Sequence, residues 1–201
     1  MAFFIRIFRS LFFLLLLPCF LFTQQDRGFR TIRDPETKQE IEAYTDSWAV
    51  IIGINRYKNA NRLEYAVADA RDVKSLLVER FGFKERNIVY LTDQEATKEN
   101  IFSAVSKLKT TKKDDRVLIY FAGHGVTTNL PAGGEMGFLV PVDGKTESDG
   151  DLLSTCISMT SIRDQLSPII AAKHVLFLVD ACYGGLATMS SRAIPRTTKD
   201  Y

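Results

Sequence analysis

The spacing of hydrophobic positions changes repeatedly between Trp48 and Val179, and each change predicts a new element. Continuous apolar runs rich in β-branched residues are typical of buried parallel strands, whereas apolar residues three and four positions apart predict amphipathic helices. Strands are expected at 48–54, 87–91, 116–122, 137–140 and 174–179. Helical spacing occurs at 63–77 before Gly82, at 101–108 after a capping Thr97, and at 162–166 after a capping Thr160. This alternation predicts an α/β fold, a mostly parallel sheet with helices on both faces.

The first 47 residues follow a different pattern. Arg6 and Arg9 precede an uncharged apolar run, 11–22, and this order is typical of an export signal. The run is shorter than the roughly 20 residues of a membrane span. No small-x-small triplet marks a cleavage site, so an anchor formed by residues 3–22 stays open as an alternative. We expect a secreted, periplasmic or membrane-anchored protein with a signal peptide or anchor at 1–25, a polar linker at 26–47 and one domain at 48–201.

Composition narrows the classes of function. Of the 201 residues, 46% are hydrophobic and 25% are charged, which fits an ordinary globular protein. The net charge of +2 comes from Arg6 and Arg9, because the remainder has equal numbers of basic and acidic residues. Such a balance argues against a nucleic-acid partner. The three cysteines have no regular spacing, which argues against a disulfide framework or a CxxC metal site.

Candidate chemistry stands at the carboxyl ends of the predicted strands, where parallel sheets collect their ligands. The first strand runs into Asn55-Arg56-Tyr57, the third into Gly123-His124-Gly125, and the last into Asp180-Ala181-Cys182. A histidine and a cysteine at one edge can form a dyad in which the imidazole takes the thiol proton. The backbone N–H groups of Gly125 and Cys182 would then hold an oxyanion. A buried structural thiol and a turn histidine are the alternatives for the two residues taken singly.

The other candidate residues favour structural roles. Cys156 has no histidine near it in the sequence and is interpreted as a packing residue, and His174 opens its strand at the opposite edge. An acidic stretch lacks the regular spacing of a calcium loop and reads as a solvated turn; it comprises Asp143, Glu147, Asp149 and Asp151. We expect no metal ligands and no required cofactor, with activation by Ca²⁺ left open.

Two strings of the chain resemble the caspase-like cysteine peptidases, peptidase family C14. They are Tyr120-Phe-Ala-Gly-His-Gly125 and Leu178-Val-Asp-Ala-Cys-Tyr-Gly184. The histidine precedes the cysteine by 58 residues, close to the roughly 50 of caspases. Asp-Ala-Cys in place of Gln-Ala-Cys is similar to the metacaspase, orthocaspase and paracaspase branches. The resemblance, over about 48–185, implies a caspase-like fold and a cysteine endopeptidase with Cys182 as nucleophile and His124 as general base and acid.

The metacaspase branch further implies an acidic S1 pocket. Asp180, two residues before the cysteine, would line it together with Asp69 in the Ala68-Asp69-Ala70 box. Asp69 shares the inward face of its predicted helix with Ala66. Two carboxylates in one pocket would select Arg or Lys at P1. The alternatives are a surface acid paired with Arg71 or Arg62 for Asp69, and a turn cap for Asp180.

The chain departs from its relatives after the nucleophile. They continue into a smaller C-terminal portion, whereas this chain stops at Tyr201, so we expect a fold that lacks the small-subunit part. An unpaired sheet edge would favour self-association or a completing chain, besides the protein or peptide substrates. Two alternatives remain: a catalytically silent caspase-like interaction module, and a legumain-like protease that cuts after Asn. Arg192 and Arg196 are candidate sites of autocleavage.

Overall fold

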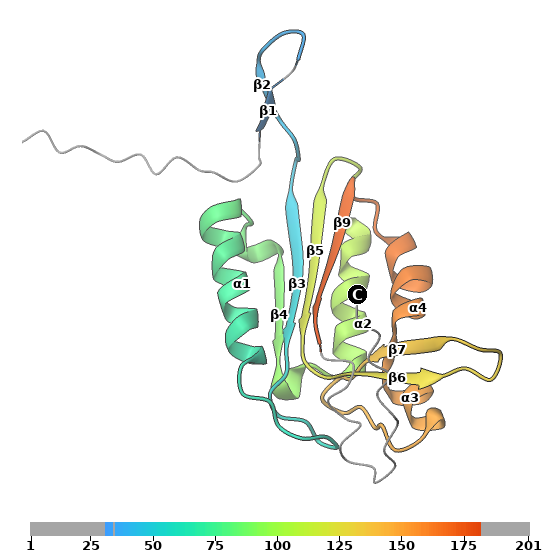
Figure 1. Cartoon of the computed structure of the whole chain (residues 1–201). Helices are drawn as coiled ribbons and strands as arrows, with labels where there is room; N and C mark the ends of the chain where they lie inside the picture. Colours follow the sequence, from blue (N-terminus) through green and yellow to red (C-terminus); the bar gives the residue numbers. More distant parts are fainter. Residues whose placement is uncertain (1–30, 34, 182–201) are drawn as a thin grey trace, which may run out of the picture.

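A four-stranded parallel sheet forms the centre of the molecule (Figure 1). The computed structural model describes residues 31–33 and 35–181. The strands lie in the order β4-β3-β5-β9 and are all parallel. Their bounds are β3 Ser47–Gly53, β4 Ile88–Thr92, β5 Arg116–Ala122 and β9 His174–Asp180. The predicted parallel sheet is confirmed, and these four strands agree with the sequence pattern to within one residue at each end.

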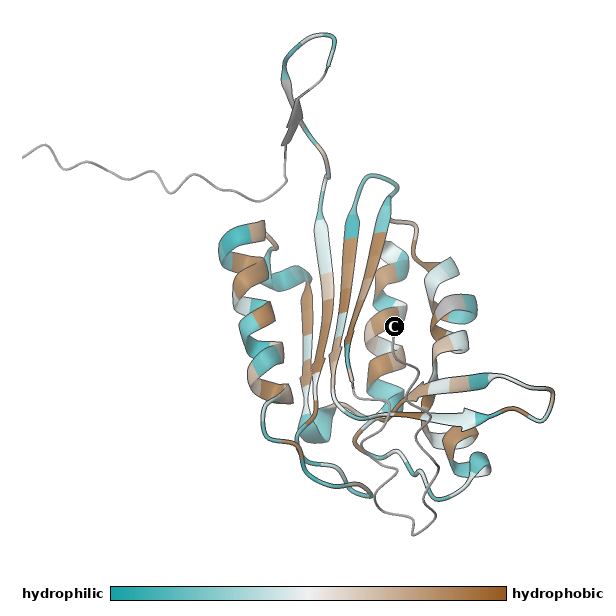
Figure 2. Ribbon diagram, viewed as in Figure 1, coloured by the Kyte–Doolittle hydropathy of each residue, from teal (hydrophilic) through white to brown (hydrophobic). Residues whose placement is uncertain are grey.

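Helices cover both faces of the sheet, as the alternation predicted. Ala49 and Ile51 of β3 pack against α1 (Ala66–Phe81), while Val50 and Ile52 pack toward α2 (Lys98–Ser106). Because successive side chains of a strand point to opposite faces, a strand buried on both sides must be apolar throughout. In Figure 2 much of the length of the central strands is brown, and polar or weakly apolar residues leave paler or teal stretches, mainly toward the strand ends. Short helical turns complete the domain: η1 Glu85–Asn87, η2 Asp93–Glu95, η3 Lys107–Thr110, α4 Met159–Ser161, η4 (a π-helix) Ile162–Leu166 and η5 Ser167–Ile169.

Two of the three expected helix signals are found where the sequence placed them. Gly82 ends α1 with a left-handed φ of 67°, and the Thr97 hydroxyl accepts a hydrogen bond from the Asn100 N–H at the start of α2. The third was wrong. Thr160 lies inside α4, and the cap is Ser158, whose side chain accepts from the Ser161 N–H. Two hydroxyl residues this close compete for one capping position, and the sequence pattern does not separate them.

The structure also contains elements that the sequence pattern did not predict. A three-stranded antiparallel sheet joins β6 (Gly125–Asn129), β7 (Glu135–Leu139) and β8 (Ile157–Ser158), of which only the β7 region was expected. Helix α3 (Asp149–Thr155) begins at the end of the acidic stretch. The carboxylates in its first turn are stabilised by the positive end of the helix dipole. A hairpin of β1 (Thr31–Arg33) and β2 (Glu40–Glu42) lies within the expected linker.

Strand β9 lies at one edge of the central sheet (Figure 1). Its side chains alternate between partly buried and exposed, and Leu176 and Leu178 are 51% and 40% exposed. Within the described ranges, no further strand pairs with its outer side. This edge therefore has apolar surface and backbone hydrogen-bonding groups to offer to another strand.

Three expectations fall on residues outside this description, namely the leader at 1–25, the nucleophile Cys182 and the candidate autocleavage sites Arg192 and Arg196. Among residues 31–33 and 35–181, no helix has the length and apolar character needed to cross a membrane.

Gly53 sets how closely α1 approaches the sheet. A Cβ at this position would lie 2.6 Å from both the Ala66 carbonyl oxygen and the Ala70 Cβ. Gly53→Ala is therefore expected to lower the free energy of unfolding by about 3 kcal/mol, the upper part of the usual cost of overpacking. Urea unfolding followed by circular dichroism measures it. Gly150→Ala is the matched control, because its Cβ would meet only the Ser148 Oγ at 3.8 Å. Equal midpoints for the two variants would contradict the close approach.

Candidate active site

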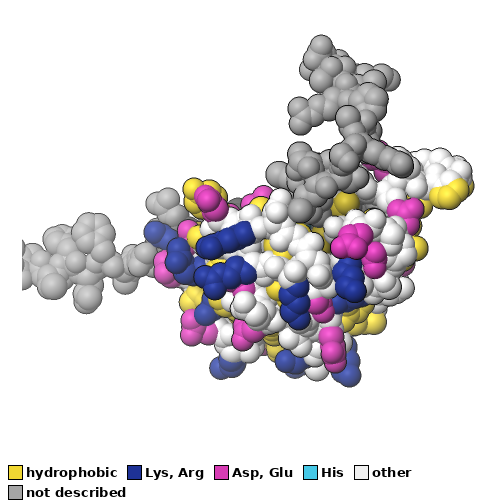
Figure 3. Space-filling model, turned by 90° about the horizontal axis from the view of Figure 1, so that it is seen from below, with side chains coloured by type: hydrophobic (Ala, Val, Ile, Leu, Met, Phe, Trp, Pro, Cys, Tyr) yellow, Lys and Arg dark blue, Asp and Glu magenta, His cyan; other side chains and the backbone are white. Residues whose placement is uncertain are grey.

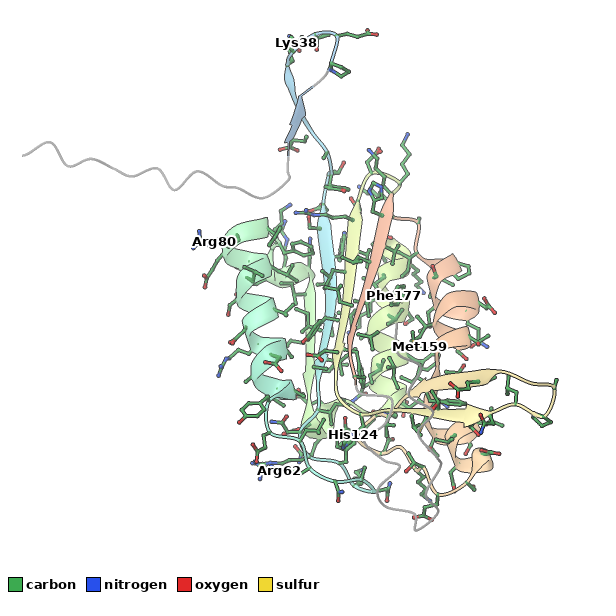
Figure 4. The ribbon with its side chains drawn as sticks, in the orientation of Figure 1. Lys38, Arg62, Arg80, His124, Met159 and Phe177 are labelled. Atoms are coloured by element: carbon green, nitrogen blue, oxygen red, sulfur yellow. The ribbon has the colours of Figure 1, made fainter. Side chains whose placement is uncertain are left out.

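A pocket of about 540 Å³ opens at the carboxyl ends of β3, β5 and β9. Its lining includes Asp69, His124 and Asp180, together with residues 61–66 of the loop that follows β3. The chain that leaves β3 leads to β4 on one side, and the chain that leaves β5 leads to β9 on the other side. The connections from these two neighbouring strands therefore run toward opposite edges of the sheet. Such a switch point is where open α/β sheets bind their ligands. Figure 4 shows His124 and Arg62 at this end of the sheet.

The strand register brings the pocket residues together. β5 and β9 pair so that Ala122 stands beside Asp180, and the Gly123 N–H donates to the Asp180 carbonyl oxygen at 3.1 Å. His124 follows directly. Asp69 comes from the first turn of α1, which packs closely on the end of β3. Three elements that are distant in the sequence thus supply an imidazole and two carboxylates to one pocket.

The imidazole of His124 is buried, at 7% exposure, and its tautomer follows from its contacts. Its Nε2 lies 2.8 Å from the carbonyl oxygen of Asn61. A carbonyl oxygen can only accept, so Nε2 carries a ring proton, and in the neutral imidazole Nδ1 is the nitrogen that keeps its lone pair. In this orientation His124 can take a proton through Nδ1.

The backbone of His124 is held by Tyr57. The His124 N–H donates to the Tyr57 Oη at 2.7 Å, and the two rings lie 4.7 Å apart, centroid to centroid, with a tilt of 43°. Burial raises the pKa of Tyr57, and the carboxylate of Asp93 adds to the rise against the opposing effect of the His124 N–H. The phenol therefore stays neutral at physiological pH.

Asp93 fixes the loop that carries Tyr57. Its Oδ1 accepts the N–H groups of Asn55 at 2.8 Å and Arg56 at 2.9 Å. Asp93 itself has a positive φ of 43°, a conformation that costs energy for a non-glycine residue and is tolerated best by Asp and Asn. The carboxylate thereby satisfies two backbone donors where the chain leaves β3.

The two carboxylates influence the phenol of Tyr120. Burial and then the charges of Asp180 and Asp69 raise the pKa of Tyr120 to about 12. The alternative pairing of Asp69 with Arg71 is not found among the described residues, because Arg71 forms its ion pair with Asp72 at 3.2 Å.

Seen from below, on the face where the parallel strands end, basic and acidic side chains are interspersed (Figure 3). Neither sign of charge dominates the visible part of this face. The residues that line the pocket include three acids, Glu64, Asp69 and Asp180, and one arginine, Arg62.

The remaining sequence candidates lie away from the pocket. Cys156 is 2% exposed in an apolar cluster, and its burial raises the pKa of the thiol, as expected of a packing residue. His174 begins β9 at the opposite end of the sheet, with its Nδ1 3.1 Å from the Tyr44 Oη. Asp143 accepts the Lys98 N–H at 3.1 Å. Within the described part of the chain, no three His, Cys, Asp or Glu side chains form a group that could hold a metal ion.

Comparison with known proteins supplies the family. The family model described as Caspase domain matches residues 46–200. The chain belongs to the caspase-domain peptidases. Metacaspase-2 of Arabidopsis thaliana is 33% identical over 148 residues, which are 68% of this chain and 34% of the relative. Metacaspase-1 of Eremothecium gossypii is 29% identical over 150 residues, 69% of this chain and 32% of the relative. The resemblance to the metacaspase branch is confirmed.

A solved structure shares the caspase-like fold. It is that of a protein from Geobacter sulfurreducens, with a TM-score of 0.56 at 22% identity, covering 71% of this chain and 53% of the other. This caspase-domain chain spans about a third of the length of the curated metacaspases it matches. Family membership supports a cysteine peptidase.

Sequence reasoning missed three groups that act on the residues of the pocket. Tyr57 was noted only as part of a strand end, although an aromatic residue three positions past the expected strand 48–54 is a usable signal. Tyr120 was read as an apolar strand residue. The Asn61 carbonyl is a backbone group, which every residue has, so the residue type at this position does not predict its role.

Proposed function

We propose that this caspase-domain chain is a cysteine endopeptidase that hydrolyses peptide bonds after Arg or Lys. Cys182 is the nucleophile, His124 is the general base and acid, and Asp69 and Asp180 bind the P1 side chain. The observation that carries the proposal is the single pocket in which an oriented imidazole adjoins two carboxylates.

The proposed reaction begins with transfer of the Cys182 thiol proton to Nδ1 of His124. The thiolate attacks the scissile carbonyl carbon, and the N–H groups of Gly125 and Cys182 stabilise the oxyanion. Collapse of this intermediate breaks the C–N bond, while His124 gives its proton to the leaving amine. Water, activated by His124, then hydrolyses the thioester and restores the thiol.

Charge in the pocket supports the choice of P1 residue. Asp69 and Asp180 both line the pocket, so a cationic P1 side chain bound there would meet two carboxylates. Arg or Lys supplies such a cation, and Arg can contact a carboxylate through two parallel hydrogen bonds.

The remaining parts of the proposal concern partners, cofactors and location. The exposed edge and apolar face of β9 support pairing with a completing chain or a second copy, in addition to binding a peptide substrate. The chemistry described needs no cofactor, and a Ca²⁺ requirement enters as an arm of the test below. Residues 1–25 are proposed to direct export or membrane anchoring.

Cleavage of matched peptides with Arg, Lys, Asn or Asp at P1 tests this function. The full chain and Cys182→Ala are assayed side by side, with and without Ca²⁺. We expect kcat/KM for Arg and Lys peptides about 100-fold above the others, and loss of all cleavage in the variant.

Any other outcome of the peptide assay would favour a different function or a different pocket. A preference for Asn would favour the legumain-like alternative, and a preference for Asp would remove the acidic-pocket assignment. No cleavage by a folded chain, with partner binding unchanged in Cys182→Ala, would favour the silent interaction module.

A further inference from the structure

We infer that Tyr57 is a positioning residue for His124: its hydroxyl anchors the histidine backbone and its ring sets the plane of the imidazole. The inference rests on the proposed function, in which His124 moves protons. Tyr57 acts through His124 rather than on the substrate, because His124 lines the pocket and Tyr57 does not.

Three contacts fix the imidazole from different directions. The His124 N–H donates to the Tyr57 Oη at 2.7 Å, the Tyr57 ring lies 4.7 Å away at a tilt of 43°, and the Asn61 carbonyl oxygen is 2.8 Å from Nε2. The first contact holds the backbone, the second restricts rotation about the side-chain bonds, and the third sets the tautomer. Two of the three come from Tyr57.

Gly123 gives the phenol its space. A Cβ at Gly123 would lie 2.5 Å from the Tyr57 Oη and 3.0 Å from the ring of Phe121. Both neighbours are side-chain rings, and because these rings are packed in the core they cannot easily move away from an added Cβ. The glycine before the catalytic histidine is therefore needed for the tyrosine as well as for the turn.

Tyr57 is itself held on both sides along the chain. Asp93 binds the N–H groups of Asn55 and Arg56 just before it, and the Lys58 N–H donates to the Val142 carbonyl oxygen at 2.9 Å just after it. A side chain acting as a support must be more rigid than the group it supports. These bonds meet that condition.

Loss of the Tyr57 hydroxyl leaves a buried N–H of His124 without its acceptor. The residue then shifts to find another partner, and Nδ1 leaves the orientation that the three contacts give it. Binding of P1 uses other groups, so the cost falls on kcat rather than on KM.

The test is Tyr57→Phe in the full chain, with Tyr44→Phe as the matched control. Tyr44 also bonds a histidine, His174, but at the far end of the sheet. The chain has only two histidines, so ¹⁵N NMR of histidine-labelled protein reads each ring separately. We expect Tyr57→Phe to lower kcat about tenfold with KM unchanged within twofold, and to replace the single Nε2–H tautomer of His124 by a mixture. Tyr44→Phe should alter only the signals of His174.

A second variant approaches the same contact from the other side. Gly123→Ala keeps the phenol but displaces its oxygen, and it is expected to reproduce the kcat loss and the His124 signature. Wild-type kcat and an unchanged His124 tautomer in folded Tyr57→Phe would overturn the inference. So would a fall in kcat that merely follows the folded fraction in thermal melts. If the wild-type chain cleaves no peptide, the proposed function fails, while the tautomer readout still decides the role of Tyr57.

Discussion

Replacing His124 with alanine is expected to lower kcat/KM for Arg peptides by at least about a thousandfold, the usual cost of removing the base of a nucleophile–base pair. Without the imidazole, the thiol of Cys182 has no proton acceptor and the leaving amine has no proton donor. The peptide assay measures the effect, and the stability of the variant is followed by thermal unfolding. His124 fills a buried position, so the melting temperature should fall as well.

His174→Ala is the control for this experiment. It removes the only other histidine, at the opposite end of the sheet, where Tyr44 is its contact. Cleavage should stay within twofold of the wild-type rate. If folded His124→Ala retained more than a tenth of the activity, the proton would have to be taken by another group, and the proposed dyad would be rejected.

The second large effect concerns the charge of the pocket. Asp180→Asn and Asp69→Asn keep the shape of each side chain but remove its charge. Each is expected to reduce kcat/KM for Arg peptides about 100-fold, because the guanidinium then loses one of its two ionic partners. Asp72→Asn, also on α1 but exposed and paired with Arg71, should leave cleavage unchanged.

The comparison of P1 residues makes this prediction specific. The loss should be largest for Arg and Lys and small for an uncharged P1 residue, since only the cations use the carboxylates. An equal loss for charged and uncharged peptides would indicate general damage to the pocket rather than loss of charge recognition. An unchanged preference for Arg in both variants would place the P1 site elsewhere.

The parallel sheet could be predicted because burial on both faces leaves a strong pattern. β3 and β5 are continuous apolar runs, and the polar residues that follow them stand at a predictable edge. The strand ends also predicted that His124 and Asp180 would lie near each other, and the pocket brings them together.

What the sequence pattern could not supply depends on contacts across the chain. β6 has the sequence Gly-Val-Thr-Thr-Asn, which lacks a continuous apolar run, and it is a strand that pairs with β7. The orientation of His124 comes from a backbone carbonyl in a loop of irregular structure, which no residue type encodes. Ser158 and Thr160 are both residue types that cap helices, and the structure has Ser158 as the cap.

The order of strands in the sheet also determines how the domain folds. Val117 of β5 pairs with Trp48 on one side and Val175 on the other, and each partner lies tens of residues away along the chain. Such high contact order requires long loops to close before the hydrogen bonds of the parallel sheet form, which slows folding. The pocket needs the ends of β3, β5 and β9 at once, so it forms only when the last of these closures is complete. A partly folded chain therefore holds no substrate pocket.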